Sequence, residues 1–340
     1  MERKSRKNIL RNLIFFLLLL VITLWIILKD QSITQILDII KGVKIQYVLV
    51  AILCMVIYII LEAVNIGRTL KILGEKTKFL KNIKYALIGF FFSSITPAAS
   101  GGQPMQIYYM HKEKISVANS TLALLLNLTS MQIITISFAL ISLCMNYQYL
   151  NTALIIFFIV GITLNVMALT LLIIGIFSRR LSKWLVKVTI KVLKIFRIKN
   201  IEEKQEKIER ELTKYQYSAK YLKENKGLIV KTLITTGIQF FIYYSITYWT
   251  YRSFGFNESN ILEIVGMQSV LYATVSGIPS PGAVGVSEGA FIEIFRNVYP
   301  EGLIKSATLL NRGVNFYLFV IISGITVIIN DLRISNGESK

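Results

Sequence analysis

The sequence has little of the chemistry that most enzymes and disulfide-rich domains depend on. It contains two cysteines and one histidine in 340 residues. Cys54 and Cys144 both lie in apolar runs, where we expect core residues rather than a disulfide. His111 stands beside an apolar segment without a cluster of other ligands, so we expect no metal site. A nucleotide-binding loop, a zinc-protease motif and a serine elbow are also missing from the sequence. We therefore expect no catalytic residues and no cofactor, and any transport would be passive, ion-coupled or dependent on another chain.

Acidic residues are half as frequent as basic ones, 19 against 38, which gives a formal net charge of +19. Hydrophobic residues make up 54% of the chain and the mean hydropathy is +0.58. This composition is typical of an integral membrane protein. We expect the positive charge to lie in cytoplasmic loops against an anionic membrane surface, and no nucleic acid as a partner, because every basic cluster flanks an apolar segment.

Apolar runs of about 20 residues can cross the hydrocarbon core as helices, and about six full spans are predicted. The basic residues before the first run predict an uncleaved signal anchor with a cytoplasmic N-terminus. Tyrosines and Trp249 at the outer end of the fifth run, among them Tyr244 and Tyr251, predict an interfacial aromatic belt. The predicted spans are Leu13–Leu28, Tyr47–Ile66, Val117–Met145, Thr152–Phe177, Leu228–Tyr251 and Leu303–Ile329.

The segment 178–227 is the longest polar stretch of the chain. Lys183, Lys187, Lys191 and Lys194 recur at helical spacing, with apolar residues on another face. This pattern predicts a basic amphipathic helix on the anionic cytoplasmic leaflet. A solvated linker without a ligand is the alternative interpretation.

Proline is scarce, and four of the five prolines lie in two short stretches. One is Thr96–Met110, with the sequence TPAASGGQPMQIYYM, and the other is Gly277–Gly289, with the sequence GIPSPGAVGVSEG. Paired prolines and glycines cannot continue a helix. Within a bilayer such broken backbone is tolerated only where protein or a water-filled cavity supplies partners.

The distribution of Lys and Arg places both ends of 83–110 inside and both ends of 261–298 outside. The two breaks are then the tips of two opposed re-entrant helical hairpins, a pattern that indicates a midplane transport site with inverted symmetry. Two proline-kinked full spans are the alternative. The predicted fold is an all-α integral membrane protein, with roughly eight hydrophobic segments in a single polytopic domain, 1–340.

Backbone amides and helix N-termini at such breaks favour anions, phosphate in particular. Charged residues within a membrane are costly and indicate function, above all Arg312, for which Glu288 would be the counter-ion. The candidate lipid-binding residues are Glu62, Asn65, Arg68, Pro97, Ser100, Gly101, Gly102, Gln103, Pro104, Gln106, Tyr108, Pro279, Pro281, Gly282, Gly285, Glu288 and Arg312.

Four motifs carry a resemblance to a known family: the spacing Glu62-x-x-Asn65-x-x-Arg68, the two Pro/Gly stretches, and Asn311-Arg312-Gly313. The chain resembles, over nearly its whole length, the lysylphosphatidylglycerol synthase transmembrane, or flippase-like, family of bacterial membrane proteins. Many relatives have an arginine where this chain has Gln106.

The resemblance implies movement of an anionic, aminoacylated or polyprenyl-phosphate lipid across the bacterial cytoplasmic membrane. In two-part relatives a soluble domain that transfers lysine from lysyl-tRNA to phosphatidylglycerol follows the membrane domain. Because this chain stops shortly after its last span, we expect no aminoacyltransferase domain. A phosphatidylglycerol lysyltransferase and a membrane scaffold for envelope enzymes are the alternatives, and a homodimer or a separate lipid-synthesising enzyme are the further partners considered.

Overall fold

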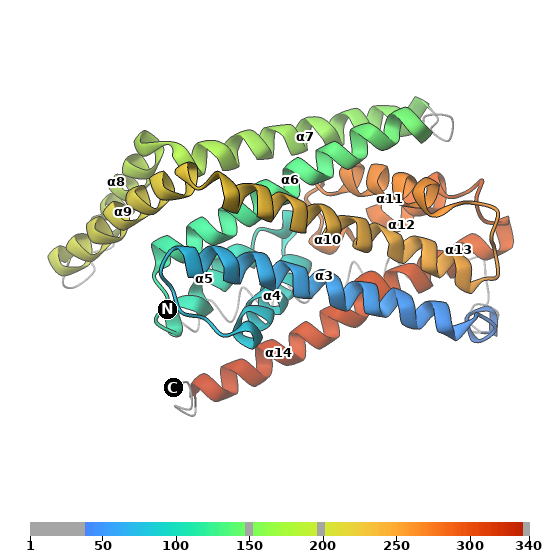
Figure 1. Ribbon diagram of the computed structural model, residues 1–340, viewed down its shortest axis with the longest axis horizontal. Helices are drawn as coiled ribbons and strands as arrows, with labels where there is room; N and C mark the ends of the chain where they lie inside the picture. The colour runs from blue at the N-terminus through green and yellow to red at the C-terminus, as the bar shows by residue number, and fades with distance from the viewer. Residues whose placement is uncertain (1–37, 147–151, 196–200, 336–340) are drawn as a thin grey trace.

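The computed structural model describes residues 38–146, 152–195 and 201–335, and every element in these ranges is a helix (Figure 1). The elements in chain order are α3 (Ile45–Ile72), α4 (Phe79–Ser94), η1 (Pro97–Ala99), α5 (Gly102–Lys112), α6 (Val117–Asn146), α7 (Thr152–Phe177), α8 (Arg179–Ile195), α9 (Ile201–Glu224), α10 (Lys226–Ser253), α11 (Ile261–Val275), η3 (Pro281–Ala283), α12 (Val286–Ile294), α13 (Glu301–Arg312), the π-helix η4 (Gly313–Tyr317) and α14 (Leu318–Ser335).

Five helical segments are long and apolar enough to cross a membrane, which makes this an all-α membrane protein. They coincide with five of the six predicted spans, and the sixth, Leu13–Leu28, lies outside the described residues. The five are Ile45–Ile72, Val117–Met145, Leu154–Phe177, Lys226–Ser253 and Gly302–Leu332.

Helices α3 and α10 pack along each other through small and polar residues. Ala51 and Ala63 are fully buried, and their size lets the backbones approach closely. Asn65 Nδ2 donates to Thr236 Oγ1 over 3.0 Å, and Gln239 Nε2 donates to the Tyr58 carbonyl over 3.2 Å. Between apolar helices, such hydrogen bonds fix the register of the pair.

Helices α4 and α5 form the first hairpin. Gly89 and Gly102 lie at their interface: a Cβ on Gly89 would stand 2.4 Å from Gln106 Nε2, and one on Gly102 would stand 2.1 Å from Ser93 Oγ. Just after α5, Glu113 pairs with Lys81 and Lys84 from the first turns of α4. The two ends of the hairpin therefore lie together, as the prediction for 83–110 requires and as a kinked full span does not.

Helices α11 and α12 form the second hairpin. Asn260 caps α11 with a capping box that includes Glu263. Phe291 of α12 and Phe295, which caps this helix, belong to one buried cluster with Ile264 of α11, so both ends of this hairpin also lie together. That these hairpins enter a bilayer and return stays a prediction.

The two hairpins come from opposite ends of the bundle. The base of the first lies at the end of the bundle where Ser116, just after the hairpin, bonds to Glu211 of α9. The second lies toward the other end, where α13 is found (Figure 1), and there the rings of Tyr251 and Tyr299 meet. Between them the tips η1 and η3 are in contact. The fold therefore brings the two proline-containing breaks, 184 positions apart from Pro97 to Pro281, to one place.

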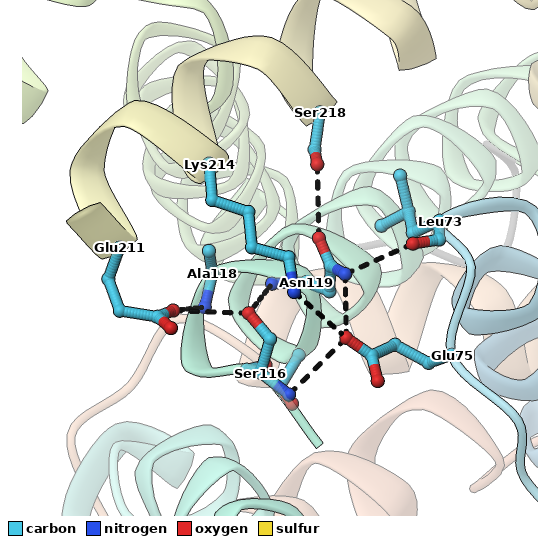
Figure 2. A network of polar contacts seen from close by, with 9 residues as sticks. Leu73, Glu75, Ser116, Ala118, Asn119, Glu211, Lys214 and Ser218 are labelled. Atoms are coloured by element: carbon cyan, nitrogen blue, oxygen red, sulfur yellow. Dashed lines mark hydrogen bonds and ion pairs between the residues drawn. The ribbon is translucent and has the colours of Figure 1, made fainter.

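Helix α9 is clamped onto the bundle by a polar network (Figure 2). Glu211 Oε2 accepts from the Ala118 amide over 2.9 Å and from Ser116 Oγ over 3.1 Å, which caps the start of α6. Asn119 Nδ2 donates to Glu75 Oε1 over 2.7 Å, and Lys214 Nζ reaches the same oxygen over 3.3 Å. Within 178–227 the described residues lie mostly in α8 and α9. The face of α9 that carries this network is packed rather than solvated.

Two sequence-based expectations about individual side chains are wrong. Cys144 is exposed on the outer surface of α6, whereas Cys54 is buried as expected. Tyr244 and Tyr251 are almost fully buried, so they belong to the packed core rather than to an exposed aromatic belt. Their rings contact Phe240 and Tyr299 respectively, because α10 turns this face toward α11 and the second hairpin.

Candidate functional site

A cavity of about 270 Å³ lies where the two hairpin tips meet. Its walls come from α3, α4, α6, α10, α11, α13 and both tips, so it is central to the bundle. Its lining includes Tyr58, Glu62, Ser93, Ala98, Ala99, Gln103, Gln106, Asn127, Tyr243, Gln268, Tyr272, Ser276, Ser280, Gly282, Ala283, Asn311, Arg312, Asn315 and Phe316. Polar and apolar surface alternate on this wall, as expected for a site that accepts an amphiphile.

The two tips have nearly the same backbone. Thr96 and Ser280 precede the prolines with φ/ψ of −120°/143° and −115°/137°. The residues after the prolines, Ala98 and Gly282, are both left-handed, at 51°/32° and 58°/16°. Two unrelated loops would have no reason to match so closely, and the match supports the inverted symmetry inferred from the sequence.

Arg312 is the charged centre of the second tip. Its Nε donates to Glu288 Oε1 over 2.8 Å, and its Nη2 donates to the Gly282 carbonyl over 3.0 Å. The side chains of Arg312 and Glu288 are 7% and 1% exposed. Because an isolated charge would be very costly in such surroundings, each residue makes the burial of the other tolerable.

Glu288 is held from two further directions. Its Oε2 accepts from the Gly285 amide over 2.7 Å, and Tyr317 donates its hydroxyl to Oε1 over 2.7 Å. Tyr317 closes the π-helix that follows Arg312, and such irregular turns are frequent at functional sites. The carboxylate therefore has two hydrogen-bond donors besides Arg312.

Phe316 fixes the position of the guanidinium and of the tip. The Arg312 guanidinium carbon lies 4.1 Å from the centre of the Phe316 ring, within the range of a cation–π contact. A Cβ on Gly282 would stand only 2.2 Å from Phe316 Cζ, and Gly282 has φ +58°. The left-handed conformation favours glycine, and the lack of space beside Phe316 excludes a larger residue unless the ring moves.

The first tip offers polar groups without a charged side chain. Thr96 Oγ1 accepts from the Gly101 amide over 2.9 Å and donates to the Phe92 carbonyl over 2.6 Å, which closes the turn. Gln106 Nε2 donates to the Tyr85 carbonyl over 2.9 Å and so ties α5 to α4. On the opposite walls the side-chain oxygens of Asn127 and Asn315 are buried without a hydrogen-bond partner in the described structure. Unused acceptors facing a cavity are available to a ligand or to water.

Comparison with known families gives one match. The family description is "Lysylphosphatidylglycerol synthase TM region", and the matched residues are 9–323. The chain belongs to this family. Neither the curated proteins nor the solved structures contained a match to the chain. The matched range includes both hairpins and Arg312, so the cavity lies within the family's own region, and the protein is a membrane protein related to lipids.

The structure divides the predicted site residues of this family member into three groups. Glu62, Gln103, Gln106, Gly282 and Arg312 line the cavity, and Glu288 is one hydrogen bond from it. Another set shapes or supports the two turns without lining the cavity, namely Pro97, Ser100, Gly101, Gly102, Pro104, Pro279, Pro281 and Gly285.

Three predicted residues lie elsewhere. Arg68 Nη1 donates to Asn65 Oδ1 over 3.3 Å and to Thr235 Oγ1 over 3.1 Å, so Asn65 and Arg68 join α3 to α10. Tyr108 is 43% exposed, and Lys112 lies over its ring. Sequence spacing alone does not separate such helix-joining residues from cavity residues.

Several cavity residues were not predicted from the sequence. They are polar side chains within apolar spans: Tyr58, Asn127, Tyr243, Gln268, Tyr272, Asn311 and Asn315. Asn311 Oδ1 accepts from the hydroxyls of Thr247 and Thr250, each over 3.3 Å. An amide inside a membrane span is a usable signal, because polar groups in hydrocarbon need partners.

Proposed function

We propose that the protein moves an anionic lipid across the cytoplasmic membrane, with the cavity between the hairpin tips as the headgroup site. The candidate lipids share one chemistry, a phosphate headgroup on an apolar tail: anionic phospholipids, their aminoacylated forms and polyprenyl phosphates. The observation that carries the proposal is the buried Arg312 on the wall of a cavity formed by two opposed tips.

Arg312 suits a phosphate because a guanidinium has five N–H donors and the Glu288 and Gly282 contacts use two of them. The guanidinium can donate two parallel hydrogen bonds to a phosphate, and this would weaken its contact with Glu288. Glu288 keeps the Gly285 amide and the Tyr317 hydroxyl, so the exchange leaves no bare charge.

The opposed hairpins suggest how the site opens to either side. Residues of both tips line the cavity, and the two hairpins enter the bundle from opposite ends. Displacing one hairpin would expose Arg312 to one leaflet while the other tip stays closed, which is alternating access around a fixed site. The basic end, with α8 and α9, would face the cytoplasm.

The test is a flipping assay with the purified chain in liposomes, using fluorescent phosphatidylglycerol and dithionite quenching of the outer leaflet. We expect faster equilibration of the labelled lipid than in protein-free liposomes, and loss of that activity in Arg312→Ala. Arg296→Ala is the matched control, because Arg296 is 60% exposed and pairs with Glu293.

Equal rates for wild type and Arg312→Ala would overturn the charged-cavity mechanism. A parallel incubation with lysyl-tRNA checks for lysine transfer to the lipid. Lysylated product made by the purified chain would instead support the synthase activity named in the family description.

A further inference from the structure

Glu62 is a second acidic group on the cavity wall, and the mechanism above does not use it. It lies near the middle of α3, a predicted and observed span, and lines the same cavity as Arg312. Within the described ranges its carboxylate has neither a hydrogen-bond donor nor a basic partner. It therefore differs from Glu288, whose carboxylate accepts hydrogen bonds from three donors.

The groups that face Glu62 cannot neutralise it. Tyr58 precedes it by one turn of α3, Tyr243 comes from α10 and Tyr272 from α11, and all three line the cavity. These rings form a tyrosine cluster with centroid separations of 4.9 Å for Tyr58–Tyr243 and 5.8 Å for Tyr243–Tyr272. The remaining polar groups of the lining are amides and serine hydroxyls, and Arg312, the one guanidinium among the described lining residues, is bound to Glu288.

A bare carboxylate in such a cavity is costly, whereas a neutral carboxyl is not. An incoming phosphate raises the cost further, because two negative charges would then share one low-dielectric space. The proton is the smallest cation that removes this repulsion, and it needs no further ligands. The cavity then holds lipid and proton together more favourably than the lipid alone.

We propose that Glu62 binds a proton that travels with the anionic headgroup, so that transport is proton-coupled. The proposal rests on the proposed lipid transport. When the cavity opens to one side, the carboxylate takes up H⁺ from water to form the neutral carboxyl. The cavity then changes sides with lipid and proton, and the carboxyl releases H⁺ as the lipid leaves. One proton accompanies one negative charge, so the step is electroneutral.

The experiment imposes a pH difference of one unit across proteoliposomes containing fluorescent phosphatidylglycerol and measures its distribution between leaflets at steady state. One-to-one coupling predicts an accumulation of up to about tenfold in the leaflet on the alkaline side, because one pH unit corresponds to a factor of ten in equilibrium. Glu62→Gln should still equilibrate the lipid but leave it evenly distributed. Glu62→Asp should retain part of the asymmetry.

The control is Glu206→Gln on α9, whose carboxylate pairs with Arg210 at the exposed surface and should leave the asymmetry unchanged. A trapped pH dye gives a second readout: lipid-dependent proton movement in wild type and none in Glu62→Gln. An even distribution in active wild type, asymmetry retained in Glu62→Gln, or asymmetry driven by a sodium gradient instead would each overturn the coupling. Absence of any flipping by wild type would instead reject lipid transport itself.

Discussion

The tips of the two hairpins have nearly the same backbone conformation, but different interactions stabilise the two hairpins. The first has a tip without charge, and ion pairs of Glu113 with Lys81 and Lys84 hold its base together. The second carries the buried Arg312–Glu288 pair at its tip, and aromatic packing holds its base together. The ion pairs of the first base join a nearly buried carboxylate, 7% exposed in Glu113, to lysines that are 43% and 22% exposed. Salt therefore screens them in part, whereas it does not weaken buried apolar packing. The comparison indicates a first hairpin whose base can loosen and a second that holds the binding charge in place.

The largest effect should come from breaking the charged tip. Arg312→Ala leaves Glu288 buried without its counter-ion, and we expect a loss of about 3–5 kcal/mol in stability. Thermal unfolding in detergent measures it. Arg296→Ala, at an exposed pair, should change stability by less than about 1 kcal/mol. Similar melting temperatures for the two variants would contradict the buried-pair assignment.

The next effect concerns the glycines at the two tips. Gly282→Ala meets Phe316 and requires a left-handed conformation, so we expect a cost of about 2–4 kcal/mol. Gly102→Ala meets Ser93 Oγ, which can rotate, and the Gly89 carbonyl oxygen at 2.9 Å, which cannot, so it should cost about 1–3 kcal/mol. Gly289→Ala has no neighbour within 4 Å and should be neutral or stabilising. The order of the three melting temperatures checks this, and a Gly102 variant that is worse than the Gly282 variant would reverse the comparison.

At the base of the first hairpin, Glu113→Gln should lower the free energy of unfolding by about 1–2 kcal/mol at neutral pH. Burial raises the pKa of Glu113, but hydrogen bonds from Lys81 and Lys84 outweigh it, so the pKa lies below its usual value. A lowered folded-state pKa gives stability that is present above the unfolded pKa of about 4.3 and is lost as the pH falls through the folded value. The difference from wild type should therefore disappear in acid and shrink in high salt. A difference that persists in acid would rule out the ionic origin.

The smallest effect is at the base of the second hairpin. Tyr251 accepts from the amides of Glu258 and Ser259 over 3.1 and 3.2 Å. Tyr251→Phe keeps the ring packing and loses these hydrogen bonds, so we expect the free energy of unfolding to fall by about 1 kcal/mol. This loss should not depend on salt concentration. Tyr217→Phe, at a side chain that is 75% exposed, is the control. A strong salt dependence in the Tyr251 variant would remove the contrast between the two bases.

Much of the architecture follows from local sequence. Long apolar runs specify the spans, and the paired prolines near Pro97 and Pro281 specify where helices must break. The hairpin form of 83–110 was predicted from charge, because Lys81 and Lys84 precede the segment and Lys112 and Lys114 follow it. The burial of Tyr244 and the exposure of Cys144 could not be predicted, because they depend on which helix covers each face.

The pairing of Arg312 with Glu288 could be predicted from the sequence, because both residues stand in otherwise apolar surroundings and each needs a partner. The role of Arg68 could not be predicted from the sequence. Its side chain bonds to Thr235, 167 positions away, and an arginine at a span end can serve either a cavity or a neighbouring helix. Only the packing of α3 against α10 distinguishes the two.

The sequence by itself determined the class of protein, the positions of its breaks and the charges that a membrane makes costly, because these depend on composition and neighbouring residues. The tertiary structure decided which breaks meet and which side chains line the cavity. It also decided that Glu288 accepts three hydrogen bonds, whereas Glu62 has no partner among the described residues. These depend on contacts between segments far apart in the chain, where the packing of whole helices outweighs any local preference.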